Sequence, residues 1–66
     1  MEYTNSEIKA LILERIHSAR DRKILYMRLV DGITYERLGE EFQLTPRQIK
    51  NIVHKAEKIL FPHLQG

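Results

Sequence analysis

Polar side chains that could recognise DNA recur at helical spacing near the end of the chain. On a helical wheel of about 100° per residue they all lie within about 60° of one direction. Arg and Lys can donate to O6 and N7 of guanine, and Asn can pair with N6 and N7 of adenine. Lys and protonated His can neutralise phosphates. This polar face, which contains no acid, consists of Arg47, Lys50, Asn51, His54 and Lys58.

The positive charge of the chain is concentrated in the same C-terminal part as this polar face. The 66 residues carry a net charge of +2. Residues 1–44 hold seven Lys/Arg and eight Asp/Glu, and residues 45–66 hold four Lys/Arg and one Asp/Glu. The two parts thus have net charges of −1 and +3. Basic charge on one element is typical of a surface that binds a polyanion. A basic helix face can also be merely solvated, so its structural context has to decide.

The element that carries this face is predicted to be a helix over about 46–60. Thr45 is a good N-cap, Pro46 suits the first helical position, and Pro62 ends the helix. Free N–H groups next to Thr45 suit contact with the DNA backbone. The opposite face is apolar, and we expect Ile52→Ala to cost roughly 2–5 kcal/mol by emptying a core position. The apolar face consists of Ile49, Ile52, Val53, Ala56, Ile59 and Leu60.

Two further helices are predicted before it, over about 6–17 and 19–31. Thr4-Asn5-Ser6-Glu7 and Ser18-Ala19-Arg20-Asp21 both have the pattern of a capping box. Apolar residues of the second helix point almost all round its axis, so we expect that helix to be central. Gly32 can end it in the left-handed conformation. The first helix has an apolar stripe of Ile8, Leu11, Ile12 and Ile16.

A short helix over about 35–42 completes the arrangement. Thr34 caps it, and Tyr35, Leu38 and Phe42 share one face. Gly39 indicates that another helix passes close by. A short helix, a turn of three residues and a longer capped helix form a helix-turn-helix. We therefore predict an all-α, four-helix domain over residues 1–66 whose helix-turn-helix packs through Leu38, Gly39, Leu44, Ile49 and Ile52.

The stretch from Asp21 to Leu60 resembles the fourth conserved region of bacterial sigma factors, and is similar to the DNA-binding domains of LuxR-type regulators. The matching segments are Asp-Arg-Lys-Ile-Leu at 21–25, Asp-Gly-Ile-Thr-Tyr-Glu-Arg-Leu-Gly at 31–39, Leu-Thr-Pro-Arg-Gln-Ile-Lys-Asn-Ile at 44–52 and His-Lys-Ala-Glu-Lys-Ile-Leu at 54–60.

The resemblance implies a transcription regulator that binds double-stranded promoter DNA and docks on RNA polymerase. It implies that the bases are contacted by Arg47, Gln48, Lys50 and Asn51. It places Thr34, Tyr35 and Arg37 near the DNA backbone, where residue chemistry adds Thr45, His54, Lys55 and Lys58.

Two departures from this family qualify the resemblance. The turn has Gln43 where glycine is common, which costs on the order of 1 kcal/mol if φ is positive. A complete chain of 66 residues also lacks the sigma regions that melt a promoter. We then expect a stand-alone regulator with a sigma-like DNA-binding head.

Catalysis and metal binding find little support in the sequence. A domain this small buries only about 60% of its unfolded surface, which leaves little room for a substrate pocket. Glu36 and Glu40 could pair as carboxylates but suit a solvated face, while His54 and Glu57 are too few ligands for a metal site. We expect no enzyme activity and no cofactor. The lack of cysteine, of a signal peptide and of a membrane span makes the cytoplasm the default location.

Two alternatives stay open. The first is a protein-binding module that docks on RNA polymerase or another regulator without reading DNA. The second concerns oligomeric state, because helix-turn-helix proteins commonly bind as dimers. Phe61 or Leu64 can fold back onto the first helix, or they can form a homodimer seam with Leu13, which lies off the apolar stripe.

Overall fold

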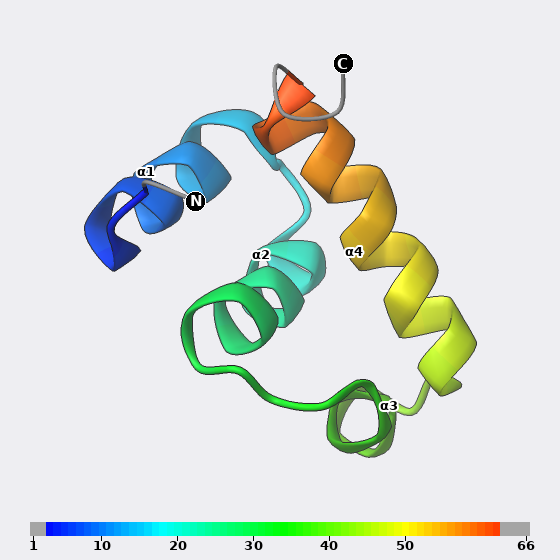
Figure 1. The fold of residues 1–66 in the computed structure, drawn as a ribbon. Helices are drawn as coiled ribbons and strands as arrows, with labels where there is room; N and C mark the ends of the chain where they lie inside the picture. Colours follow the sequence, from blue (N-terminus) through cyan, green and yellow to red (C-terminus); the bar gives the residue numbers. More distant parts are fainter. Residues whose placement is uncertain (1–2, 63–66) are drawn as a thin grey trace.

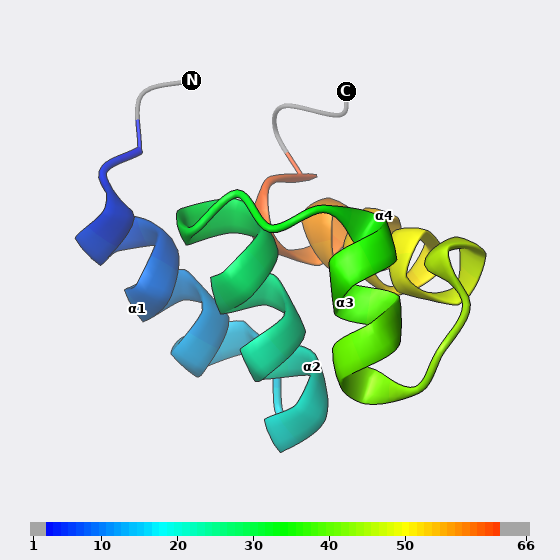
Figure 2. The same cartoon turned by 90° about the horizontal axis from the view of Figure 1, so that it is seen from below.

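The computed structural model describes residues 3–62, which form an all-α domain (Figure 1). Its α-helices are α1 (Asn5–Arg15), α2 (Ala19–Leu25), α3 (Tyr35–Phe42) and α4 (Pro46–Leu60), and a π-helical turn (Tyr26–Val30) continues α2. The predicted fold class and the order of the four helices are therefore confirmed. Seen from the two directions of Figures 1 and 2, α2 lies between α1 and α3, and α4 packs across them.

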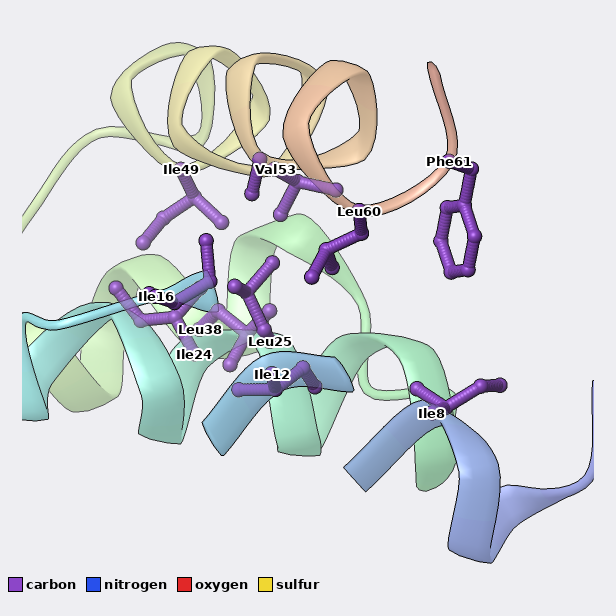
Figure 3. Close-up of a cluster of buried hydrophobic side chains, with 11 residues drawn as sticks. Ile8, Ile12, Ile16, Ile24, Leu25, Leu38, Ile49, Val53, Leu60 and Phe61 are labelled. Atoms are coloured by element: carbon purple, nitrogen blue, oxygen red, sulfur yellow. The ribbon is translucent and has the colours of Figure 1, made fainter. Parts of the chain in front are cut away.

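A single apolar core joins all four helices (Figure 3). α2 contributes two fully buried side chains and contacts both α1 and α4, so the first part of the helix predicted over 19–31 is central, as expected. No residue of the π turn that follows is buried. The π turn contacts α1 and α3. The buried apolar side chains of the core are Ile8, Ile12, Ile16, Ile24, Leu25, Leu38, Ile49, Val53, Ala56, Leu60 and Phe61.

Every α-helix begins at a hydroxyl side chain that accepts a backbone N–H, as the capping patterns predicted. The box is complete at Thr4 and at Thr45. At Ser18 only half of the predicted box forms. The Ser18 hydroxyl accepts the Asp21 N–H at 3.3 Å, but the Asp21 carboxylate accepts from the Arg20 guanidinium at 3.1 Å instead.

The first two helices differ from prediction where they end. α1 ends at Arg15 rather than near residue 17, because Ile16 takes an extended conformation that still buries its side chain. The second helix is α-helical only to Leu25 and then widens into the π turn, closed by a 3.3 Å bond from the Asp31 N–H to the Tyr26 carbonyl. The sequence does not predict this change, because apolar side chains on all sides of the axis suit an α-helical turn and a π-helical turn equally. Gly32 has the predicted left-handed conformation, with φ of 72°.

The buried face of α4 is narrower than the predicted apolar face. Ile49, Val53, Ala56 and Leu60 are buried, and on the helical wheel they fall within about 60° of arc. Ile52 is only half-buried and Ile59 is 48% exposed. The wheel places both about 60–80° from Ile49 on the same side, at the edge of the contact. Ile52, predicted to occupy a core position, is therefore at the edge of the core, and it packs against the core as the half-buried Leu44 does.

The turn of the helix-turn-helix explains the position of Gly39. Gln43 has φ of 57° and ψ of 44°, so this non-glycine residue does take the left-handed conformation. The Leu44 N–H then donates to the Gly39 carbonyl at 2.9 Å. A Cβ on Gly39 would lie 2.6 Å from the Leu44 carbonyl oxygen. A Cβ on Gly39 would also lie 3.4 Å from the Pro46 nitrogen, so the close neighbours of Gly39 are the backbone of the turn and the first residue of α4.

The chain after α4 folds back onto its own beginning. Phe61 is 5% exposed, and its ring centroid lies 5.1 Å from that of Tyr3. Because it is buried within the domain, Phe61 is not available for the homodimer seam that was considered as an alternative. Leu64, the other residue considered, lies outside the described residues. Leu13 remains 54% exposed.

Ile49→Ala should reduce the free energy of unfolding by roughly 2–5 kcal/mol, because truncation of this fully buried side chain leaves a cavity in the core. Ile59→Ala is the matched control on the same helix and should cost less than about 1 kcal/mol. Urea denaturation followed by circular dichroism measures both. Equal losses in the two variants would contradict the observed rotation of α4.

Gly39→Ala should also destabilise the domain. Alanine gains about 1 kcal/mol in helix propensity. Its Cβ meets backbone rather than a flexible side chain, and such overpacking typically costs about 1–3 kcal/mol. A thermal melt should therefore show a lower midpoint than wild type, and a higher midpoint would show that the turn is free to move away.

Candidate nucleic-acid interface

The polar face of α4 points to solvent along its whole length. Arg47, Lys50, Asn51, His54 and Lys58 are all exposed, while the opposite side of the helix lies in the core. The flanking Gln48 and Lys55 are exposed as well. The face predicted from the wheel is therefore available to a partner.

Most arginines before α4 are engaged inside the protein. The Arg15 guanidinium donates to the carbonyls of Ile59 and Leu60 at 3.4 Å, and Arg20 pairs with Asp21 at 3.1 Å. Arg22 donates to the carbonyls of Leu13 and Ile16, and Arg28 donates to that of Ile33. Within residues 3–62 the cationic side chains without such a partner are Lys9, Lys23, Arg37, Arg47, Lys50, Lys55 and Lys58.

Four of these seven unengaged cations belong to α4. The accessible positive charge is therefore more concentrated on this helix than the formal charges indicate. Because α4 contains only one acid, the half-buried Glu57, the charge on its exposed surface is predominantly positive. A surface of this kind attracts a polyanion through long-range electrostatics.

An open depression brings several of the predicted contact residues together. It lies where α3 and α4 begin, so both helix N-termini border it. Helix N-termini carry partial positive charge and favour anions. Glu36 is the one acid in its wall. The depression is lined by Tyr35, Glu36, Pro46, Arg47, Lys50 and Asn51.

The other predicted contacts lie apart from this depression. Thr34 caps α3, and its hydroxyl accepts the Arg37 N–H at 3.2 Å, so both residues are beside the N-terminus of α3. His54 and Lys58 lie farther along α4, with Lys58 about 16 Å from Arg47 along the helix axis. Lys55 borders a different depression, between α4 and the start of α2.

Gln48 has a second role that the sequence prediction missed. Its side-chain oxygen accepts the Thr45 N–H at 2.8 Å, and the Thr45 hydroxyl accepts the Gln48 N–H at 3.1 Å. The cap uses one of the two lone pairs of this oxygen and holds the side chain at Thr45, which competes with a bidentate pair with adenine. The Gln48 amide NH₂ remains the free part of this side chain.

Arg28 is the residue of this region that sequence reasoning did not identify. Its guanidinium carbon lies 4.4 Å from the centroid of the Tyr35 ring, and its Nη1 donates to the Ile33 carbonyl at 3.0 Å. No periodic pattern links these positions, because they meet only through the π turn and the bend at Gly32.

Residues 3–62 offer neither a cluster of metal ligands nor a membrane-spanning helix. No three His, Cys, Asp or Glu side chains there are grouped as ligands for a metal ion. None of the helices described is both long and apolar enough to cross a membrane.

Comparison with protein families gives one match, to sigma-70, region 4, over residues 18–60. The matched segment begins at the Ser18 cap and ends at the last residue of α4, so it contains α2, α3 and α4. No curated protein and no solved structure matches the chain. Since the match covers about two thirds of the residues and includes the complete helix-turn-helix, the chain belongs to the sigma-70 region 4 family of DNA-binding domains.

Proposed function

We propose that the protein is a sequence-specific transcription regulator that reads the major groove with α4. The observation that carries this proposal is the unengaged basic face of α4 beside the two helix N-termini. A helix fits within the major groove, which is about 12 Å wide. The second helix of a helix-turn-helix enters the groove with its N-terminal residues toward the bases.

In this arrangement the first turns of α4 contact base edges. Arg47 and Lys50 donate to guanine, and Asn51 pairs with adenine. Gln48 contributes its amide NH₂ while its oxygen holds the cap. All four side chains are exposed, and three of them line the depression at the helix N-termini.

The surrounding residues hold the DNA backbone. Thr34, Tyr35 and Arg37 at α3 and Thr45 at α4 contact phosphates near the helix N-termini. His54, Lys55 and Lys58 extend this contact along α4, with Lys55 at its margin. The backbone contacts set the register of the domain on DNA, and the base contacts supply specificity.

Affinity of this single domain for one site is limited by its size. A module of this kind buries only about 600–1,000 Å² of protein surface on DNA. Tight specific binding therefore requires a second anchor, which RNA polymerase or a second copy of the chain would supply.

A second candidate function is that of a protein-binding module that docks on RNA polymerase or another regulator. It is favoured by a depression whose lining includes the apolar side chains of Ile16, Ile52, Ala56 and Ile59. The exposed Leu13 adds apolar surface elsewhere on α1. Exposed apolar patches commonly serve protein partners.

Lys50→Ala should weaken binding to random-sequence duplex DNA and make its salt dependence shallower by about one in the slope of log K against log salt. On DNA without the target site the Lys50 ammonium neutralises a phosphate instead of donating to a specific guanine, so the variant loses one phosphate contact there. Fluorescence anisotropy over a salt series measures both quantities. Lys9→Ala, which removes an exposed lysine from α1, is the matched control and should retain the wild-type slope. Absence of wild-type binding at low salt would contradict DNA recognition.

Ile59→Ser should leave DNA affinity nearly unchanged, because Ile59 lies about 120° around α4 from Arg47. Lys55, at the margin of the basic face, is the one proposed DNA contact that lines the same depression. The same variant should lose binding to purified RNA polymerase if that depression is a docking site, as measured by biolayer interferometry. Phe61 is unsuited to this test because it is buried. The second candidate is favoured if Ile59→Ser loses polymerase binding while Lys50→Ala remains fully functional.

A further inference from the structure

Arg28 connects the π turn to the beginning of α3. The guanidinium donates to the Ile33 carbonyl on one side of Thr34 and covers the Tyr35 ring on the other. Arg28 thus contacts the residues on both sides of Thr34, which is the N-cap of α3. The bond to Ile33 is partly buried, and Arg28 itself is half-buried.

Arginine is suited to both contacts at once. Its planar guanidinium can stack on an aromatic face while the N–H groups at its edge donate in the same plane. A lysine ammonium is a compact charge on a flexible chain, which makes the two contacts together difficult. The pair of contacts therefore favours arginine over lysine at residue 28.

The π turn is what allows this reach. The widened turn ends at Val30, and Gly32 then reverses the chain through its left-handed conformation. The Ile33 N–H donates to the Met27 carbonyl at 3.0 Å, which keeps the segment before α3 close to the π turn. Arg28 completes this connection through its side chain.

We propose that Arg28 is a positioning residue for DNA binding: it fixes the N-terminus of α3 and the Tyr35 ring for contact with the DNA backbone. The inference rests on the proposed function. Tyr35 lines the depression shared with Arg47 and Lys50, so its placement sets one wall of the site. Fixing these groups before binding reduces the conformational entropy lost on association. The Arg28 guanidinium acts through Tyr35 and Ile33 and contacts no phosphate itself.

The test compares Arg28→Met, Tyr35→Ala and the double variant by fluorescence anisotropy on random-sequence duplex DNA over a salt series. Arg28→Met should weaken binding about three- to tenfold, because the groups that Arg28 orders in the free protein must then be ordered on association. The salt slope should stay at the wild-type value, because no phosphate contact is removed. In the Tyr35→Ala background the same substitution should have little further effect, since coupled residues are not additive.

Arg15→Met is the matched control. Arg15 also donates to backbone carbonyls, but at the far end of α4, so its loss removes the same charge without touching the site. It should retain wild-type DNA affinity. The Tyr35 ring signals in NMR spectra without DNA should shift in Arg28→Met and not in Arg15→Met. If Arg28→Met does not fold, Arg28→Lys serves instead and should weaken binding with an unchanged slope.

Three outcomes would overturn the inference while leaving DNA binding intact. The first is wild-type DNA affinity in Arg28→Met. The second is a salt slope of Arg28→Met that is shallower by about one, which would mean that Arg28 contacts a phosphate directly. The third is an equal loss of affinity when Arg28→Met is made in the Tyr35→Ala background. If wild type itself fails to bind at low salt, the proposed function fails, and the positioning role in DNA binding fails with it.

Discussion

The orientation of α4 depends on one narrow apolar stripe. Ile49, Val53, Ala56 and Leu60 are the buried residues of α4, which packs on α1, α2 and α3. A helix with four buried residues in line cannot rotate about its axis without exposing them. Because a helix rotates about its axis as one body, burial of this stripe also fixes the opposite face, so Arg47, Lys50 and Asn51 point to solvent. In a domain of this size the core is thin, so the same few side chains stabilise the fold and aim the polar face.

The arginines before α4 contribute indirectly to the same surface. Arg15, Arg22 and Arg28 donate to backbone carbonyls at helix ends and in connecting segments, where main-chain acceptors would otherwise lack partners. Their positive charges thus serve the fold. The lysines and arginines that remain unengaged are concentrated on α4, and the chain presents a basic surface although its net charge is only +2.

The beginning of α4 combines structural and binding roles in one place. Thr45 and Gln48 satisfy each other's backbone N–H groups, which starts the helix at a defined residue. Pro46 has no N–H, so the N–H of Arg47 is the free backbone donor of the first turn. The cap that defines the helix therefore also limits what Gln48 can offer to a base, and leaves most of the direct reading to its neighbours.

Local patterns in the sequence were sufficient for the fold class, the four helices, the hydroxyl caps and the polar face of α4. These features depend on contacts between residues three or four apart, which helical periodicity and capping chemistry describe well. Tertiary packing decided the rest. It placed Ile52 and Ile59 at the edge of the core, put the Leu44 carbonyl against Gly39 and closed Phe61 onto Tyr3. It also brought Arg28 to Tyr35 across a π turn, because that contact depends on how the chain bends between two helices rather than on any repeat along one helix.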